Sequence, residues 1–193
     1  MTRDLGQTPS QTLGPFFSMR LGGERQNVVP LPEGSERVVI TGRVLDGEGN
    51  RVEDALLETW QADPEGRYRH PDDRRDPDLD PAFTGFARVL SDFETGEYRL
   101  ETFRPGHVPD PEGEPQAPHI AVIIQSRGML NPLFTRIYFS DETPANDQDL
   151  VLRMVPEERR NTLIATLKDG SVPKEYQHDI RLQGDNETVF LDF

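Results

Sequence analysis

The sequence contains no cysteine among its 193 residues. Disulfide bonds, thiolate metal sites and cysteine nucleophiles are therefore excluded. Long apolar runs are also missing, since no stretch approaches the roughly 18 apolar residues of a membrane-spanning helix. The first residues, MTRDLGQT, lack the apolar centre of a signal peptide. We therefore expect a cytoplasmic protein.

Positive charge is scarce. The chain has 21 Lys and Arg against 35 Asp and Glu, which gives a formal net charge of −14. A charge of this sign argues against nucleic acid and against anionic membranes as the main partners. An anionic substrate would need a local cation within this repulsive field.

The local sequence motifs of catalysis are absent as well. There is no GxSxG elbow and no GxxxxGK[ST] or GxGxxG loop. The histidines show no HxH or HxxxH spacing, so no two of them form a local chelate. From the residues alone we expect a structural or solvated role for each of His70, His107, His119 and His178.

What the chain does contain is a series of short β-type segments separated by turns. Its 17 prolines and 16 glycines predict many turns and few long helices. The last two segments are expected to pair as a hairpin around the GDN sequence. The series predicts one all-β domain, residues 1–193, folded as an antiparallel sandwich or barrel. The predicted strands are 37–45, 55–61, 86–90, 97–102, 119–125, 133–139, 176–183 and 187–192.

Four other segments interrupt this pattern. Residues 70–83 are charged and proline-rich, and residues 104–118 hold five prolines, so both are predicted to be long irregular loops. Residues 156–167 are predicted to form a helix, because a proline begins the segment and KDG follows it. Residues 146–152 are a candidate for a second short helix.

The N-terminal stretch TPSQTLGPFF, residues 8–17, places two phenylalanines beside prolines and a glycine. We expect its backbone to be extended or turned and not helical. Two interpretations remain open for Phe16 and Phe17. The arm packs them on its own domain, or it reaches a partner chain or lines a pocket.

Arginine is the candidate cation. The stretch IIQSRGMLNPLF places Arg127 directly after an apolar strand and before Gly128. A guanidinium at a strand end can bind a carboxylate through two hydrogen bonds. The structural alternative is an ion pair with one of the many acidic residues of this chain. Arg136, which alternates with apolar residues in LFTRIYF, is predicted to point out of the core or into an interface.

Several of these stretches, taken in order, resemble the intradiol ring-cleaving dioxygenases. They are TPSQTLGPFF, VLDGEGNRVEDALLETWQADPEGRY, LDPAFTGFARVLSDFETGEYRLETFRPG, APHIAVIIQSRG, FTRIYF and GDNETVFLDF. The resemblance implies a β-sandwich with long loops and one or two short helices. It also implies chemistry in which a non-haem ferric ion, Fe(3+), binds a catechol such as protocatechuate and O2 opens the ring between the hydroxylated carbons.

Members of this family hold the iron with two tyrosines and two histidines. At the tyrosine positions this chain has Arg75 and Val108, and at the histidine positions it has His119 and Ala121. Three of the four ligands are therefore missing. By this resemblance the chain binds no metal of its own.

The resemblance also pairs such a chain with a similar, iron-bearing beta chain whose pocket it completes. Residues 1–36 are then an arm and linker that contact the partner. The family often has tyrosine where this chain has Phe16. The implied substrate-binding residues are Arg127, Thr12, Gly14, Pro15 and Phe16. The alternatives are a stand-alone β-sandwich that binds a ligand without an oxygenase partner, and a self-sufficient homomeric dioxygenase.

Overall fold

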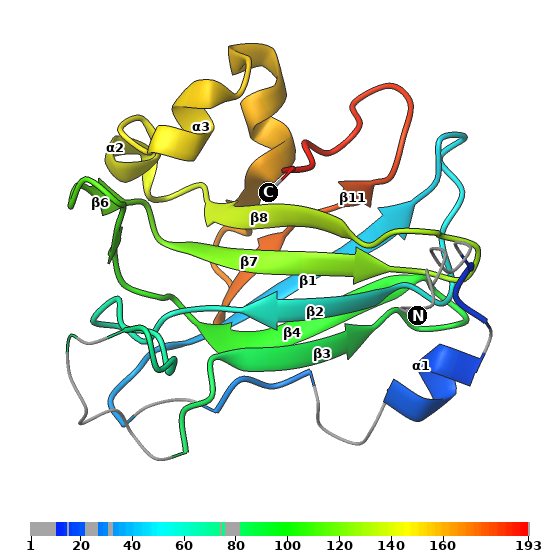
Figure 1. The fold of residues 1–193 in the computed structure, drawn as a ribbon, viewed down its shortest axis with the longest axis horizontal. Helices are drawn as coiled ribbons and strands as arrows, with labels where there is room; N and C mark the ends of the chain where they lie inside the picture. Colours follow the sequence, from blue (N-terminus) through cyan, green and yellow to red (C-terminus); the bar gives the residue numbers. More distant parts are fainter. Residues whose placement is uncertain are drawn as a thin grey trace, which may run out of the picture.

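The computed structural model describes residues 11–14, 16–21, 27–30, 33–73, 75 and 82–192. Two layers of strands pack face to face, with the short helices at the edges (Figure 1). The helices and strands, in chain order, are α1 (Phe16–Leu21), β1 (Arg37–Leu45), β2 (Leu56–Trp60), β3 (Phe86–Leu90), β4 (Glu97–Phe103), β5 (Val108–Pro109), β6 (Pro115–Gln116), β7 (His119–Gln125), β8 (Leu133–Phe139), α2 (Thr143–Asn146), α3 (Leu150–Met154), a 3₁₀ helix η1 (Glu157–Leu163), β9 (Ile164–Leu167), β10 (Lys174–Gln177) and β11 (Ile180–Arg181).

The strands form two layers that one strand connects. The β1 layer consists of β4, β1, β10 and β11, and the β7 layer consists of β3, β2, β7 and β8. Strand β9 joins the layers, because it pairs with β10 on one side and with β8 on the other. The predicted all-β sandwich is confirmed. It is not purely antiparallel, since β1 pairs in parallel with β10 and β11, and β8 pairs in parallel with β9.

The alternation of side chains along the strands fills the space between the layers. In β1, Val38 and Ile40 point into the core, and in β7 the inward residues are Ile120, Val122 and Ile124. These side chains belong to one buried cluster that includes residues of both layers. Every second residue of β7 consequently faces away from the core. This outer face carries the pocket described below.

The structure splits the predicted strand at 176–183. Strands β10 and β11 pair with β1 in one continuous register, but His178 and Asp179 leave the ladder between them. The carbonyl oxygen of His178 packs directly on Gly42, where an added Cβ would lie 1.7 Å from it. The backbone at His178 therefore lies too close to β1 for β10 to continue as a regular strand into β11.

The predicted helix at 156–167 is wrong in its second half. Residues Glu157–Leu163 form a 3₁₀ helix, and Ile164–Leu167 then form β9. The edges of β8 and β10 both offer unpaired backbone groups to this segment. Pairing with two strands overrides the local preference for a helix, because it satisfies the backbone of a segment that lies between the layers.

The predicted C-terminal hairpin is also absent. Residues 187–192 form no strand. The N–H of Thr188 donates to the carbonyl of Arg181 over 2.9 Å, and the N–H of Leu191 donates to the carbonyl of Phe134 over 2.8 Å. The segment thus crosses from β11 to β8, and side-chain hydroxyls of Thr188 and Thr135 add further hydrogen bonds to these two, but no regular ladder forms.

Two loop predictions need smaller corrections. Residues 104–118 were expected to be irregular, but β5 and β6 form a two-stranded hairpin within them. The expected helix at 146–152 is replaced by the two short helices α2 and α3. Asp149 separates these helices, because its side chain accepts a hydrogen bond from the N–H of Leu152 and so caps α3. The described residues contain three short α-helices, one more than the sequence predicts.

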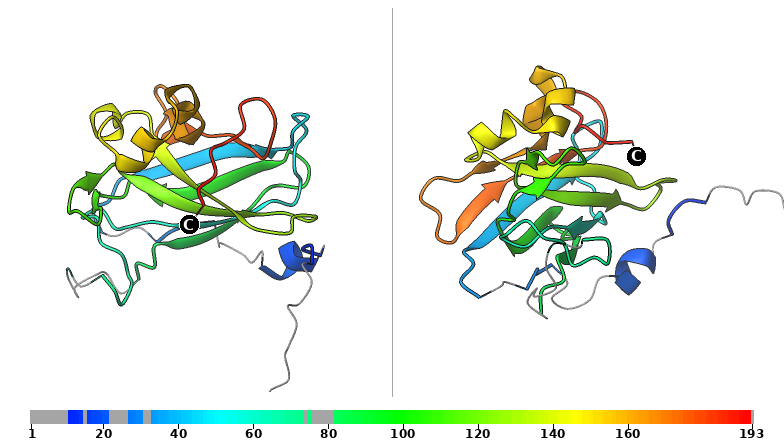
Figure 2. Two further views of the ribbon diagram at one scale, coloured as in Figure 1. Left: turned by 45° about the horizontal axis from the view of Figure 1, so that its top comes forward. Right: turned by 60° about the vertical axis from the view of Figure 1, so that its left-hand side comes forward.

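The N-terminal segment contains a helix that the sequence analysis does not predict. Helix α1 begins at Phe16, and Figure 2 shows it beside the sandwich and outside both sheets. The Phe16 side chain is 74% exposed. Residues 27–30 behave differently, because Val29 is fully buried and its N–H donates to the carbonyl of Glu101 on β4. No helix in the described part of the chain is long and apolar enough to cross a membrane.

Candidate functional site

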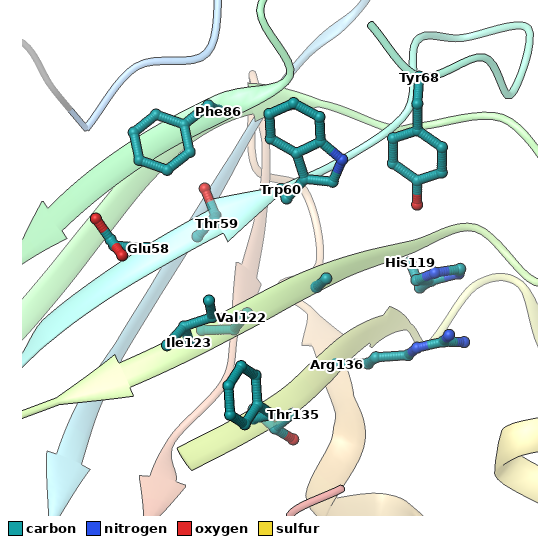
Figure 3. Close-up of a pocket in the computed structure, with 12 residues that line it drawn as sticks. Glu58, Thr59, Trp60, Tyr68, Phe86, His119, Val122, Ile123, Thr135 and Arg136 are labelled. Atoms are coloured by element: carbon teal, nitrogen blue, oxygen red, sulfur yellow. The ribbon is translucent and has the colours of Figure 1, made fainter. Parts of the chain in front are cut away.

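A pocket opens on the outer face of the β7 layer. Trp60, Ala121 and Arg136 lie side by side in register on β2, β7 and β8, and strand alternation points all three away from the core. The cavity has a volume of about 370 Å³. Small-molecule sites have volumes of roughly 300–1,000 Å³. The close-up in Figure 3 shows the side chains that line it.

One wall of this pocket is aromatic. The rings of Trp60 and Tyr68 stack with their centroids 6.2 Å apart and their planes 7° from parallel. The N–H of Tyr68 donates to a carboxylate oxygen of Asp73 over 2.7 Å, which fixes the segment after β2 that carries the tyrosine. Burial raises the pKa of the Tyr68 phenol, so its hydroxyl stays protonated at neutral pH. Phe86 and Phe134 extend the apolar lining.

His119 lies at the end of the pocket where β7 begins. Its Nδ1 is 2.8 Å from the carbonyl oxygen of Ala117, and Nδ1 carries the proton because a carbonyl can only accept. Burial, reinforced by the nearby guanidinium of Arg136, lowers the pKa of His119 to about 4. The imidazole is therefore neutral at pH 7, and its Nε2 is an acceptor.

Arg136 occupies the same end of the pocket as His119 (Figure 3). Its Nη1 donates to Oε1 of Gln116 over 2.8 Å and to the hydroxyl of Tyr138 over 3.2 Å. The Tyr138 hydroxyl in turn donates to the buried carboxylate of Asp149 over 3.0 Å. The side chains that fix the guanidinium within the described structure are thus neutral.

Only two of the four positions that the resemblance assigns to iron ligands line the pocket. His119 and Ala121 both line the pocket, two residues apart on β7. Val108 lies in the β5–β6 hairpin, opposite Gln116. The side chain of Arg75 donates from Nε to Asp73 over 2.8 Å. Neither of these two residues is part of the pocket lining.

This donor set does not fit a ferric ion. Within the described residues there is no group of three or more His, Cys, Asp or Glu that could hold a metal. Among the described residues that line the pocket, His119 is the one imidazole, and the positive Arg136 occupies the same end. The phenol of Tyr68 keeps its proton because burial disfavours the phenolate. We therefore assign no reaction step to a metal in this chain.

A second cluster of predicted residues lies at the other end of β7. Arg127 follows β7 directly, and its Nε forms an ion pair with Oδ2 of Asp54 at 3.2 Å. Oδ1 of the same carboxylate accepts a hydrogen bond from the hydroxyl of Ser126 over 3.1 Å. Asp54 is buried, whereas the Arg127 side chain is 59% exposed. The buried carboxylate thus anchors an arginine whose guanidinium faces solvent.

The N-terminal arm passes next to this arginine. The N–H of Leu13 donates to the carbonyl of Met129 over 3.3 Å, in the turn where Gly128 has a φ of +91°. Thr12 and Gly14, the neighbours of Leu13, are both exposed. The structure therefore brings Leu13 of the arm and the turn after Arg127 together, and the substrate-binding role of the set stays a prediction. Pro15, which belongs to that set, lies outside the described residues.

The pocket and the arm cluster are separate sites. The pocket is lined by His119, Ala121, Val122 and Ile123 of β7, whereas the arm cluster lies beyond the last residue of that seven-residue strand. A strand of this length spans roughly 20 Å. His119 lies at the first end of the strand, and Arg127 follows the second end.

The sequence analysis missed several residues that shape these two sites. It did not assign Asp54 to Arg127, and it did not place Trp60 or Tyr68 in a pocket. A signal for part of the pocket was present, because residues at every second position of neighbouring strands share a face. The expectation that Arg136 points out of the core agrees with its place in the pocket lining.

The β-sandwich fold and the order of its strands agree with one family of enzymes. The chain matches the family described as Dioxygenase over residues 13–184, and it belongs to this intradiol dioxygenase family. It is 39% identical to the protocatechuate 3,4-dioxygenase alpha chain of Pseudomonas putida, over 98% of both chains. It is 42% identical to the alpha chain of Burkholderia cepacia, over 97% of this chain and 98% of that one.

Two further similarities agree with the family. The chain is 35% identical to the protocatechuate 3,4-dioxygenase beta chain of Burkholderia cepacia, over 93% of this chain and 77% of that one. Its fold is similar to the intradiol ring-cleavage dioxygenase from Tetranychus urticae, with a TM-score of 0.63 and 19% identity. That similarity covers 94% of this chain and 98% of the solved one, and at this identity it supports the fold alone.

Proposed function

We propose that this chain is the alpha subunit of a protocatechuate 3,4-dioxygenase and acts in a complex with an iron-bearing beta chain. The observation that supports this proposal is the donor set at the four ligand positions. Arg75, Val108 and Ala121 offer no ligand atom for iron, and His119 alone remains. The dioxygenase relatives include both an alpha and a beta chain. The Fe(3+) of the complex is therefore assigned to the beta chain.

The reaction assigned to the complex is the intradiol cleavage of protocatechuate. The bond between the two hydroxylated carbons breaks, and both atoms of O2 enter the product, 3-carboxy-cis,cis-muconate. An iron held by the partner would supply the activation of the catechol toward O2. This places the protein in the catabolism of aromatic compounds through the beta-ketoadipate pathway, and a cytoplasmic location remains a prediction.

Arg127 is the residue of this chain assigned to the substrate carboxylate. Its Nε is held by Asp54 at 3.2 Å, and within the described structure its two Nη groups form no hydrogen bond. Both groups are thus available for the two-point binding of a carboxylate that a guanidinium favours. A cation at this position also offsets the repulsion that a chain of net charge −14 exerts on an anionic substrate.

The arm is assigned to the wall of the partner's substrate pocket. The exposed Phe16 offers an apolar ring, and Thr12 and Gly14 are held next to the Arg127 turn by the hydrogen bond of Leu13. Pro15 restricts the backbone between Gly14 and Phe16. The domain assignment, in which residues 1–36 contact the partner chain, is part of the same proposal.

Purification with and without the beta chain tests the assignment. The chain expressed alone is expected to hold no stoichiometric iron and to show no ring cleavage. Co-expression with the beta chain is expected to give a stable complex that contains iron and cleaves protocatechuate. Iron and turnover in the chain alone would support the self-sufficient dioxygenase instead. Failure to associate with any beta chain would support a stand-alone binding module.

The variant Arg127→Gln in the complex tests the role of the arginine. A hydrogen-bonded ion pair contributes roughly 1.5–3 kcal/mol, so kcat/KM for protocatechuate is expected to fall roughly 10- to 150-fold. Catechol lacks the carboxylate and is expected to lose little. The matched control is Arg43→Gln, because Arg43 is similarly exposed at 51% and pairs with Glu97 on the sheet surface. Equal losses on both substrates would remove the role assigned to Arg127.

A further inference from the structure

The pocket beside Arg136 lies apart from the residues assigned to the reaction. Arg127 and the arm are at one end of β7, and the pocket is near the other end. We propose that this pocket binds a single-ring aromatic carboxylate. Arg136 binds the carboxylate, and the stacked rings of Trp60 and Tyr68 form the surface for the aromatic ring.

The charge of Arg136 is the first argument for an anionic ligand. Most of the arginines near the sheets pair with acidic side chains, for example Arg43 with Glu97 and Arg88 with Glu58. In the part of the chain that the structure describes, Arg136 forms no ion pair with a carboxylate, and only its Nη1 donates a hydrogen bond. A guanidinium in an apolar cavity with nitrogen atoms left over is suited to bind a carboxylate.

The shape of the cavity is the second argument. Ala121 lies between Trp60 and Arg136 in the strand register and contributes only a methyl group. Besides the flat aromatic wall, Phe86 and Phe134 line the same cavity. A cavity of about 370 Å³ with one cation and aromatic sides fits one planar ring that carries one negative group.

The position of Glu58 limits the ligand to one carboxylate. Glu58 lines the pocket, and its carboxylate accepts a hydrogen bond from Nε of Arg88 over 2.6 Å. In the strand register Glu58 is two residues and two strands away from Arg136. This offset separates the Cα atoms by roughly 12 Å. A second carboxylate on the far side of the ring would find Arg88 already paired with Glu58 and would gain no ion pair of its own there.

The fluorescence of Trp60 provides a direct test, because it is the only tryptophan in the chain. Titration of the full chain with benzoate is expected to change the Trp60 emission saturably. The neutral benzamide is expected to bind at least tenfold more weakly, in line with a charge-assisted hydrogen bond of about 1.5 kcal/mol or more. The dicarboxylate terephthalate is also expected to bind more weakly than benzoate, because its second carboxylate lies on the side of Glu58. No saturable change, or equal binding of benzoate and benzamide, would overturn the proposal.

Two variants locate the binding. Arg136→Gln is expected to weaken benzoate at least tenfold, whereas Arg43→Gln on β1 leaves it unchanged. Ala121→Leu keeps the charge of Arg136 but fills the floor of the cavity, and it is expected to abolish the change in emission. Circular dichroism establishes that each variant is folded. If Arg136→Gln does not fold, Ala121→Leu decides, and full benzoate binding by Ala121→Leu would contradict the assigned site.

Discussion

Burial keeps two histidines of the sandwich neutral. The Nε2 of His178 donates to the carbonyl of Thr162 over 3.0 Å, and the hydroxyl of Tyr98 donates to the carbonyl of His178 over 2.6 Å. Removal from water lowers the pKa of His178 to about 4, and the pKa of His119 falls to the same value for the same main reason. Both rings are neutral in the folded protein at a pH where the unfolded chain begins to bind protons.

This difference predicts that the free energy of unfolding decreases as the pH falls. An unfolded histidine titrates near pH 6.5, and these two folded histidines titrate near pH 4. Below about pH 6.5 the unfolded state therefore binds more protons, and each histidine removes up to ~1.4 kcal/mol of stability per pH unit. Urea unfolding between about pH 7 and pH 5, where few acidic groups titrate, measures the slope. We expect the variant His178→Gln to show roughly half of this slope, because one of the two buried histidines is then missing.

The exposed His70 supplies the control for this measurement. Its side chain is 54% exposed, so His70→Gln is expected to leave the slope of unfolding free energy against pH unchanged. If His178→Gln and His70→Gln gave the same slope, the stability change would not come from the buried rings.

At the scale of single residues, the sequence predicts where arginines lie but not what they contact. The position of Arg127 after an apolar strand indicated a guanidinium that binds a carboxylate or an acidic residue of this chain, and in the structure it pairs with Asp54. Its anchor Asp54 precedes β2 and comes next to it only when β2 and β7 pair. Trp60 and Arg136 share the pocket only because β2, β7 and β8 pair in this order. These contacts follow from the sheet order, which the local sequence does not contain.

At the scale of elements, Gly42 determines how β1 meets the split strand beside it. Strands β10 and β11 keep one register on β1, although His178 and Asp179 interrupt the ladder. The His178 carbonyl occupies the space where a side chain at position 42 would be, and the N–H of Arg43 is satisfied by a side-chain oxygen of Asp179 over 3.0 Å. The junction depends on the absence of a Cβ at Gly42.

The variant Gly42→Ala is expected to destabilise the sandwich by roughly 2–4 kcal/mol. The new Cβ would lie 1.7 Å from the carbonyl oxygen of His178, which must move together with the Tyr98 hydroxyl that donates to it. Gly14→Ala is the matched control, since a Cβ there would meet no atom within 4 Å. Denaturant unfolding of both variants measures the difference, and equal midpoints would contradict the assigned close contact.

The strands that could be predicted are those whose own sequence combines β-branched or aromatic residues with turn residues at the end. The bounds of β1, β3, β7 and β8 agree with the sequence prediction, because β-branched and aromatic residues end there at turn residues. The strand β9 could not be predicted, since PEERRNTLIATL favours a helix locally and β9 forms only between two strand edges. Likewise, residues 187–192 read as a strand but cross between β11 and β8.

At the scale of the whole molecule, the β7 layer carries two sites, the pocket along β7 and the Arg127 turn after the end of this strand. The pocket near His119 keeps an aromatic wall and an arginine but lacks the donors for iron. The Arg127 turn and the arm lie beyond the other end of the strand and present exposed groups. In the proposed complex this separation lets the chain contribute to a partner's pocket without involving its own.

This arrangement predicts that the arm can be removed without unfolding the sandwich. The core begins with Val29, and within the described arm Leu13 contacts the domain through one backbone hydrogen bond to Met129. A chain that lacks residues 1–21 is therefore expected to keep its midpoint of thermal unfolding within a few degrees. In the complex with the beta chain it is expected to lose kcat/KM for protocatechuate roughly 10- to 100-fold, because the pocket loses the wall that positions the substrate. The full-length complex is the control, and unchanged turnover by the truncated complex would show that the arm lies elsewhere.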